Sequence, residues 1–175
     1  SLDGLTPAEQ LTRIHADAQQ LIERQQHNWR ILRAELRMAR IAVLAPDELT
    51  DEERAYLKPL FMTEVFPLLT PLAVDPAHPF PRVLNKSLNF AIELEGRDSF
   101  GRTSRAAIVQ APRALPRLIR LPADVANAPY AFVFLSSILH AHVEALFGGM
   151  QVKGCHQFRV TRNSDLFVDE EEIKN

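Results

Sequence analysis

The sequence contains few of the features that mark specialised classes of protein. One cysteine, Cys155, occurs among the 175 residues, so no disulfide can form within the chain, and this usage suits a reducing cytosol. No apolar run approaches the roughly 20 residues that a membrane-spanning helix needs. The net charge is only −2, which argues against non-specific binding of polyanions by the chain as a whole.

Two common phosphate-binding motifs are also missing. None of the six glycines is followed by a lysine, which excludes the glycine-rich loop of the P-loop enzymes, and there is no dinucleotide fingerprint. What is present is the composition of a soluble globular protein, with 46% hydrophobic and 24% charged residues. The length suffices for one ordinary domain or two small ones.

The first part of the chain has the pattern of amphipathic helices. Residues 6–9 combine a capping threonine, a proline in the first turn and a glutamate three residues after the threonine. Apolar residues then recur at close to helical spacing, which predicts one long helix from Pro7 to Arg40. Thr50–Glu53 begins a second helix, which Pro59 is expected to kink or split. We expect this second helix to cover part of the apolar stripe on the first.

Alternation replaces the helical pattern in the second half of the chain. Leu88, Phe90, Ile92 and Leu94 alternate with polar or small residues, which predicts a strand. Further strands are predicted at Arg105–Gln110, Leu118–Leu121, Tyr130–Leu135 and Phe158–Arg162, a loop at Gly96–Ser104, and a helix at Ser136–Phe147. The whole pattern indicates an α+β fold, with an antiparallel helical bundle segment over residues 1–66 and a two-layer α/β sandwich of mostly antiparallel strands over residues 67–175.

Two segments are too unusual for generic packing. Phe66–Pro81 holds five prolines from Pro67 onward, each of which fixes φ and lacks an N–H, so we expect an extended path that is neither a helix nor a central strand. Phe158–Glu172 changes from alternation to an acidic run, in which Asp169 and Glu172 have the spacing of a helix start.

Both segments closely resemble the long-chain bacterial polyphosphate kinase family. The resemblance is carried by Leu69–Pro76, His78–Pro81, Asn85, Ser87–Asn89 and Phe158–Asn163, together with Asp165 and the acidic run Asp169–Glu172. It implies that residues 1–66 are the end of a helical N-terminal domain and residues 67–175 part of a head domain. The parent enzyme would transfer the ATP γ-phosphate to inorganic polyphosphate through a phosphohistidine.

The same resemblance implies that the chemistry lies outside this chain. The phosphohistidine and the Mg²⁺ site would follow residue 175, and the residues that help to hold adenine would precede residue 1. We therefore expect no catalytic, cofactor-binding or metal-binding residue here, and a fragment that is inactive by itself. The parent would bind ATP, Mg²⁺ and polyphosphate, form a homo-oligomer through the head domain, and be cytoplasmic, with membrane association through the parent enzyme left open.

Each of the six histidines has a simpler interpretation than metal binding or phosphoryl transfer. His15 and His27 are expected to be solvated, His140 and His142 to point to different faces of a helix, His142 to be a hydrogen-bonded core residue, His156 to lack further metal ligands, and His78 to fix its loop by hydrogen bonds. For Asp165 and Asp169–Glu172, helix capping is preferred to a magnesium site.

One basic window supports an alternative function. Arg97, Arg102, Arg105, Arg113, Arg117 and Arg120 are opposed only by Asp98, a local excess of five positive charges. Arginine forks suit phosphate oxygens, so the chain could instead be a stand-alone module that binds RNA or polyphosphate. We prefer the interpretation of a solvated surface or a subunit contact.

Overall fold

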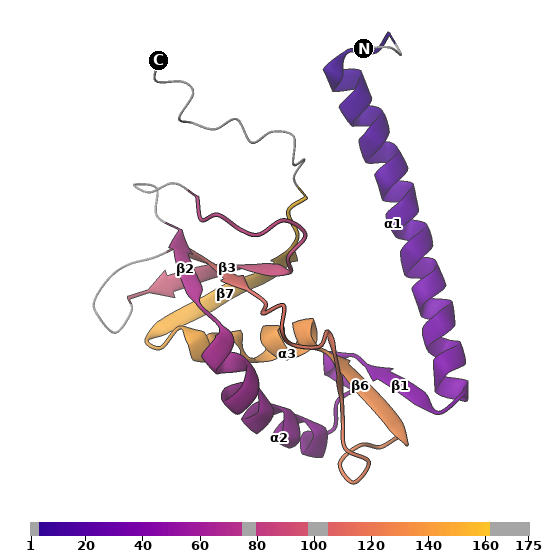
Figure 1. Cartoon of the computed structure of the whole chain (residues 1–175), viewed down its shortest axis with the longest axis vertical. Coiled ribbons are helices and arrows are strands. Elements are labelled where there is room, and N and C mark those ends of the chain that lie inside the picture. The colour runs from indigo at the N-terminus through magenta and orange to yellow at the C-terminus, as the bar shows by residue number, and fades with distance from the viewer. Residues whose placement is uncertain (1–3, 75–79, 98–104, 162–175) are drawn as a thin grey trace. The chain divides into compact units, whose positions relative to one another are not determined.

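The computed structural model describes residues 4–74, 80–97 and 105–161 (Figure 1). Its internal contacts divide the chain into two units. The first comprises Ser1–Leu44 with Arg120–Phe132, and the second Ala45–Ile119 with Val133–Asn175. The domain boundary between residues 66 and 67 that the resemblance implies stays a prediction. Some of the features noted in the sequence lie outside the described residues, namely His78, Arg102, the predicted 96–104 loop beyond Arg97, and the acidic segment after residue 161.

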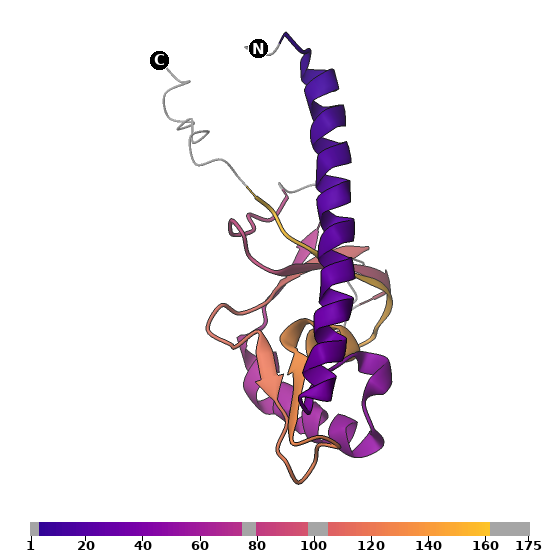
Figure 2. The same ribbon diagram turned by 90° about the vertical axis from the view of Figure 1, so that its right-hand side faces the viewer.

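The first unit is built on helix α1, Pro7–Met38, which Figures 1 and 2 show as one continuous rod. The predicted capping box is present: the Glu9 N–H donates to Thr6 Oγ1 at 3.3 Å, and the Thr6 N–H donates to Glu9 Oε2 at 2.8 Å. None of its residues is buried, and Leu11 and Leu21 are 67% and 66% exposed. The expectation that the second helix covers part of this stripe stays a prediction, since the two helices belong to different units.

Three short strands form a separate sheet, whose residues are divided between the two units. The sheet order is β1 (Ile41–Leu44), β6 (Tyr130–Phe134) and β5 (Leu118–Arg120). Strands β5 and β6 confirm the sequence prediction, whereas β1 was not predicted. Arg40 adopts a left-handed φ of 62°, which breaks the helix and starts this strand. Arg33 of α1 then holds the strand by donating from Nε to the Val43 carbonyl at 2.9 Å.

The second unit begins with a helix that changes pitch at its proline. A 3-10 turn, η1 (Pro46–Glu48), precedes α2 (Asp51–Leu60), which continues as the π-helical turn η2 (Phe61–Val65) and the 3-10 turn η3 (Phe66–Leu68). Pro59 cannot donate an N–H to the helical ladder, so a change of register directly after it has a physical cause. The proline-rich segment thus starts with a helical turn, contrary to prediction, because Pro67 is tolerated in the first turn of a helix.

An antiparallel sheet forms the body of the second unit. Its order is β2 (Pro71–Val74), β4 (Ala106–Gln110), β3 (Asn89–Gly96) and β7 (Met150–Phe158). Phe90, Ile92 and Leu94 on β3 are buried, as the alternation predicts. Strand β2 lies at the sheet edge, which agrees with the expectation that prolines keep this segment out of a central position.

The last strand lies earlier in the sequence than predicted. It ends at Phe158 rather than starting there, because Phe158 pairs with Asn89, the first residue of β3. Beyond that pair, a single bond from the Lys86 N–H to the Val160 carbonyl at 2.8 Å continues the contact. Polar residues and Gly154 interrupt the alternation within β7, and this concealed the strand in the sequence.

The helix predicted at Ser136–Phe147 is present, but it ends in a tighter, 3-10 turn. Helix α3 spans Leu135–His142 and continues as the 3-10 turn η4, Val143–Leu146. Ile138, Leu139 and Val143 are buried, as predicted, whereas His142 and Leu146 are only half-buried. The α+β class inferred from the sequence is therefore confirmed.

Capping of α2 should contribute measurably to stability. The Glu53 N–H donates to Thr50 Oγ1 at 3.2 Å, and Glu53 is only 1% exposed. Replacing Thr50 by alanine removes this acceptor from a buried helix start, so we expect the free energy of unfolding to fall by about 1 kcal/mol. Urea denaturation of the purified chain measures it.

Thr6→Ala is the matched control, because it removes the same capping box from a helix with no buried residue. Its effect on global unfolding should be clearly smaller. An equal loss of unfolding free energy in the two variants would contradict the expectation that the start of α2 contributes more to stability than the start of α1.

Candidate functional site

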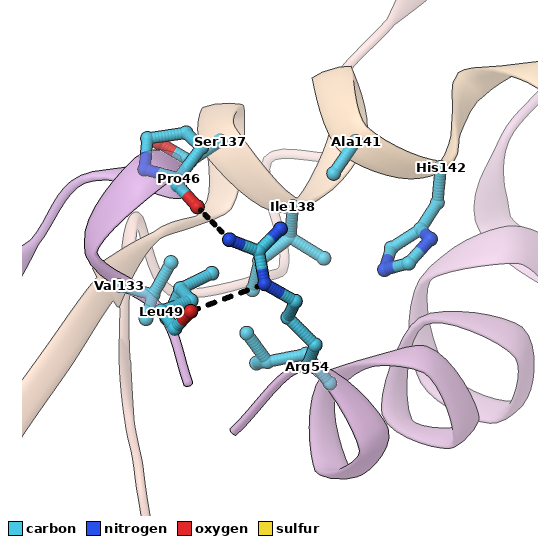
Figure 3. Close-up of a pocket in the computed structure, with 9 residues that line it drawn as sticks. Pro46, Leu49, Arg54, Val133, Ser137, Ile138, Ala141 and His142 are labelled. Atoms are coloured by element: carbon cyan, nitrogen blue, oxygen red, sulfur yellow. Dashed lines mark hydrogen bonds between the residues drawn. The ribbon is translucent and has the colours of Figure 1, made fainter. Parts of the chain in front are cut away.

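The second unit contains a pocket of about 160 Å³ formed by residues of η1, α2, β6 and α3 (Figure 3). Its apolar walls come from Leu57, Val133 and Ile138, all of which are buried. Its polar groups belong to Arg54, Ser137 and His142, and Pro46, Leu49 and Ala141 complete the lining. This is the geometry of a small binding site, since an apolar pocket with a few convergent polar groups is the usual form of one.

Arg54 is held in a fixed position at this pocket. Its Nε donates to the Leu49 carbonyl at 3.1 Å and its Nη2 donates to the Pro46 carbonyl at 3.0 Å (Figure 3). These two bonds use one edge of the guanidinium, out of five N–H groups in the side chain. The other edge, formed by Nη1 and the second hydrogen of Nη2, has no recorded partner among the described residues, and Figure 3 shows it on the side of α3.

His142 lies at the opposite end of the pocket. Its ring is 5.1 Å from the ring of Phe61, with an interplanar angle of 35°, so aromatic packing holds it where a hydrogen bond was expected from the sequence. Burial, and secondarily the positive charge of Lys58, lowers the pKa of His142 below its usual 6.5. The imidazole is therefore neutral at pH 7, which suits a pocket wall and not a cation.

The remaining histidines are dispersed over the molecule. His15 and His27 are exposed on α1, as predicted, and His140 is exposed on α3. His156 faces Glu93 across the sheet, with 3.4 Å between Nε2 and Oε1. Among the described residues there is no group of three or more His, Cys, Asp or Glu side chains placed to hold a metal ion.

Two arginines of the basic window have side-chain contacts in the described part of the chain. Arg113 donates from Nη2 to the Asn85 carbonyl at 2.7 Å. Arg120 belongs to the first unit, with its guanidinium carbon 5.3 Å from the centre of the Tyr130 ring. Arg105 lies at one end of β4, where its carbonyl accepts from the Leu94 N–H at 2.9 Å and its side chain is exposed. These two guanidinium groups thus already have structural contacts.

The turn before β3 is built from internal hydrogen bonds. Ser87 and Asn89 are 1% and 0% exposed. Asn89 Nδ2 donates to the Ser87 carbonyl at 2.9 Å, and Ser87 Oγ donates to the Leu84 carbonyl at 2.7 Å. Lys86, directly before Ser87, has a φ of 56°. The side chains of Ser87 and Asn89 are thus used to shape the chain, so part of the unusual motif has a structural role.

Sequence reasoning did not identify the pocket. Thr50–Glu53 was read correctly as a helix start, but nothing in the pattern indicated that Arg54 would turn back to η1. Ser137 and Ala141 looked like ordinary helix residues. Only His142 had been singled out, as a core residue. No helix among the described residues has the length and apolar character needed to cross a bilayer.

Protonation of His142 should make the fold sensitive to acid. Because its folded-state pKa lies below 6.5, the unfolded chain binds a proton first as the pH falls. Stability contributed by the neutral ring is therefore complete above about pH 6.5 and is lost progressively below it. We expect His142→Phe, which keeps the packing against Phe61, to flatten the decline in melting temperature between pH 7.5 and pH 5.

His140→Phe serves as the control, since it changes an exposed histidine two residues away on the same helix. Its pH profile should match that of the unchanged chain. A His142→Phe profile that also matches would show that this ring does not carry the acid sensitivity.

Comparison with known proteins identifies the family. A sequence profile described as the polyphosphate kinase middle domain matches residues 52–175. Polyphosphate kinase of Neisseria meningitidis serogroup C is 51% identical over 174 residues, which cover 99% of this chain and 25% of that protein. The enzyme of Pseudomonas aeruginosa is 47% identical over 177 residues, with the same coverage of 99% and 25%.

A solved structure agrees with the fold. The crystal structure of polyphosphate kinase from Porphyromonas gingivalis superimposes with a TM-score of 0.70 over 85% of this chain and 25% of that one, at 24% sequence identity. The chain thus spans only about a quarter of the length of these relatives. Within that limit, this chain belongs to the polyphosphate kinase family.

Proposed function

We propose that the chain is a non-catalytic scaffold region of a polyphosphate kinase. The whole enzyme transfers the γ-phosphate of ATP, bound with Mg²⁺, to inorganic polyphosphate through a phosphohistidine outside these residues. The region contributes to a homo-oligomer through its head domain, in a cytoplasmic enzyme. Support comes from the family match together with the 25% coverage of the relatives, which leaves most of each relative's sequence elsewhere.

The exposed stripe of α1 is the observation that carries the scaffold role. Apolar residues along one side of this 32-residue helix remain accessible, namely Leu11, Ile14, Leu21, Ile22 and Leu32. Most helical stability in proteins comes from packing of an amphipathic face, so a stripe of this length favours cover by other parts of the kinase. The helix would then join the remainder of the enzyme to the sheet units described here.

A charge placed on the stripe should lower the stability of the full-length kinase but not that of the isolated chain. Ile22 is 49% exposed here, so Ile22→Glu should change the stability of this chain by less than about 0.5 kcal/mol. In the full-length kinase the same change would bury an unpaired carboxylate, and the melting temperature should fall by several degrees. Differential scanning fluorimetry of both proteins measures this.

Gln20→Glu is the matched control, because it adds the same charge to the exposed side of α1 opposite the stripe. It should leave both melting temperatures nearly unchanged. If Ile22→Glu leaves the full-length kinase as stable as Gln20→Glu does, the stripe is not covered and the scaffold role loses its support.

Charge reversal in the basic window separates the scaffold from a polyanion-binding module. We expect the purified chain to synthesise no polyphosphate from ATP and to bind polyphosphate weakly. Combined Arg105→Glu, Arg113→Glu and Arg117→Glu should change that binding less than about threefold, because Arg105 and Arg113 lie at opposite ends of β4. A large loss of polyphosphate binding that is greatest at low salt would favour the polyanion-binding module.

A further inference from the structure

The proposed scaffold role assigns no part to the pocket at Arg54. It combines an apolar floor with one edge of a fixed guanidinium, all within the second unit. We propose that this pocket binds a small aromatic monocarboxylate, with the ring on the floor and the carboxylate on Arg54. This inference is independent of the proposed scaffold function.

The guanidinium is already oriented for such a ligand. Bonds to the Leu49 and Pro46 carbonyls occupy its Nε and one hydrogen of Nη2, and so they fix the plane of the group. The remaining edge carries two parallel N–H groups, the arrangement that binds both oxygens of a carboxylate. Because the side chain is held before binding, little of its rotamer entropy remains to be lost when the ligand arrives.

The size and polarity of the pocket indicate that the part of the ligand beyond the carboxylate is a single apolar ring. The pocket holds about 160 Å³, close to the cavity of about 150 Å³ that accepts benzene in another protein. Leu57, Val133 and Ile138 offer the ring only carbon surface, and His142 adds a neutral aromatic wall. Inorganic phosphate is a poor match, since an anion with polar oxygens on every side would place some of them against this apolar floor.

The neighbouring charges are consistent with an anionic ligand of low charge. Lys58 lies near enough to His142 to affect its protonation, and it adds a second positive group on α2. Asp51 and Glu52 in the first turn of the same helix limit the net positive potential. A monoanion with an apolar body suits this balance better than a polyanion does.

Benzoate is the probe for this proposal. In a ¹⁵N-labelled sample of the chain, titration with benzoate should shift the amide signals of Arg54, Ser137 and His142, with a dissociation constant on the order of 1 mM. Benzamide, which keeps the ring and loses the charge, should bind about tenfold more weakly. Toluene tests the apolar floor alone and should be weaker than benzoate as well.

Two pairs of variants test the site. Arg54→Gln should weaken benzoate binding about 10- to 100-fold, whereas Arg105→Gln, which removes an exposed charge elsewhere in the unit, should not change it. Ala141→Phe should block the pocket from its rim. Ala145→Phe, at an exposed alanine that does not line the pocket, should not.

Ala141 and Arg54 are both exposed, so neither variant replaces a core residue. The proposal is overturned if benzoate causes no shifts at these residues up to about 20 mM. Equal affinity for benzoate and benzamide, or full benzoate affinity in a folded Ala141→Phe chain, would overturn it as well.

Discussion

The pairing of β3 on both of its edges is the constraint on which the second unit depends. β4 pairs with one edge and β7 with the other, so three segments far apart in the sequence share one register. The side chains of Phe90 and Ile92 are each 1% exposed, and a slip of one residue would turn them to the opposite face. The buried Ser87–Asn89 turn directly before β3 helps to set where that register begins.

The two units use their hydrophobic residues in different ways. The second unit buries large apolar side chains on β3 and α3, among them Phe90, Ile92 and Ile138. The first leaves a long helical stripe accessible. The chain covers 25% of the Neisseria meningitidis relative, and under the proposed scaffold role other parts of the kinase would cover the stripe.

Local signals were sufficient to predict the elements with strong periodicity or capping chemistry. The start of α1 at Pro7, the start of α2 at Asp51 and the alternation of β3 all follow from nearest-neighbour patterns. The errors have other causes. The end of β7 is set by its distant partner β3. The bonds from Arg54 to Leu49 and Pro46 are local, but they follow no capping or periodic pattern.

Arg54 also has a mechanical consequence. Its guanidinium ties the carbonyls of Pro46 and Leu49 to α2. A single side chain therefore stiffens the turn that leads into this helix. A ligand bound to the remaining edge of the guanidinium would stiffen the same turn further.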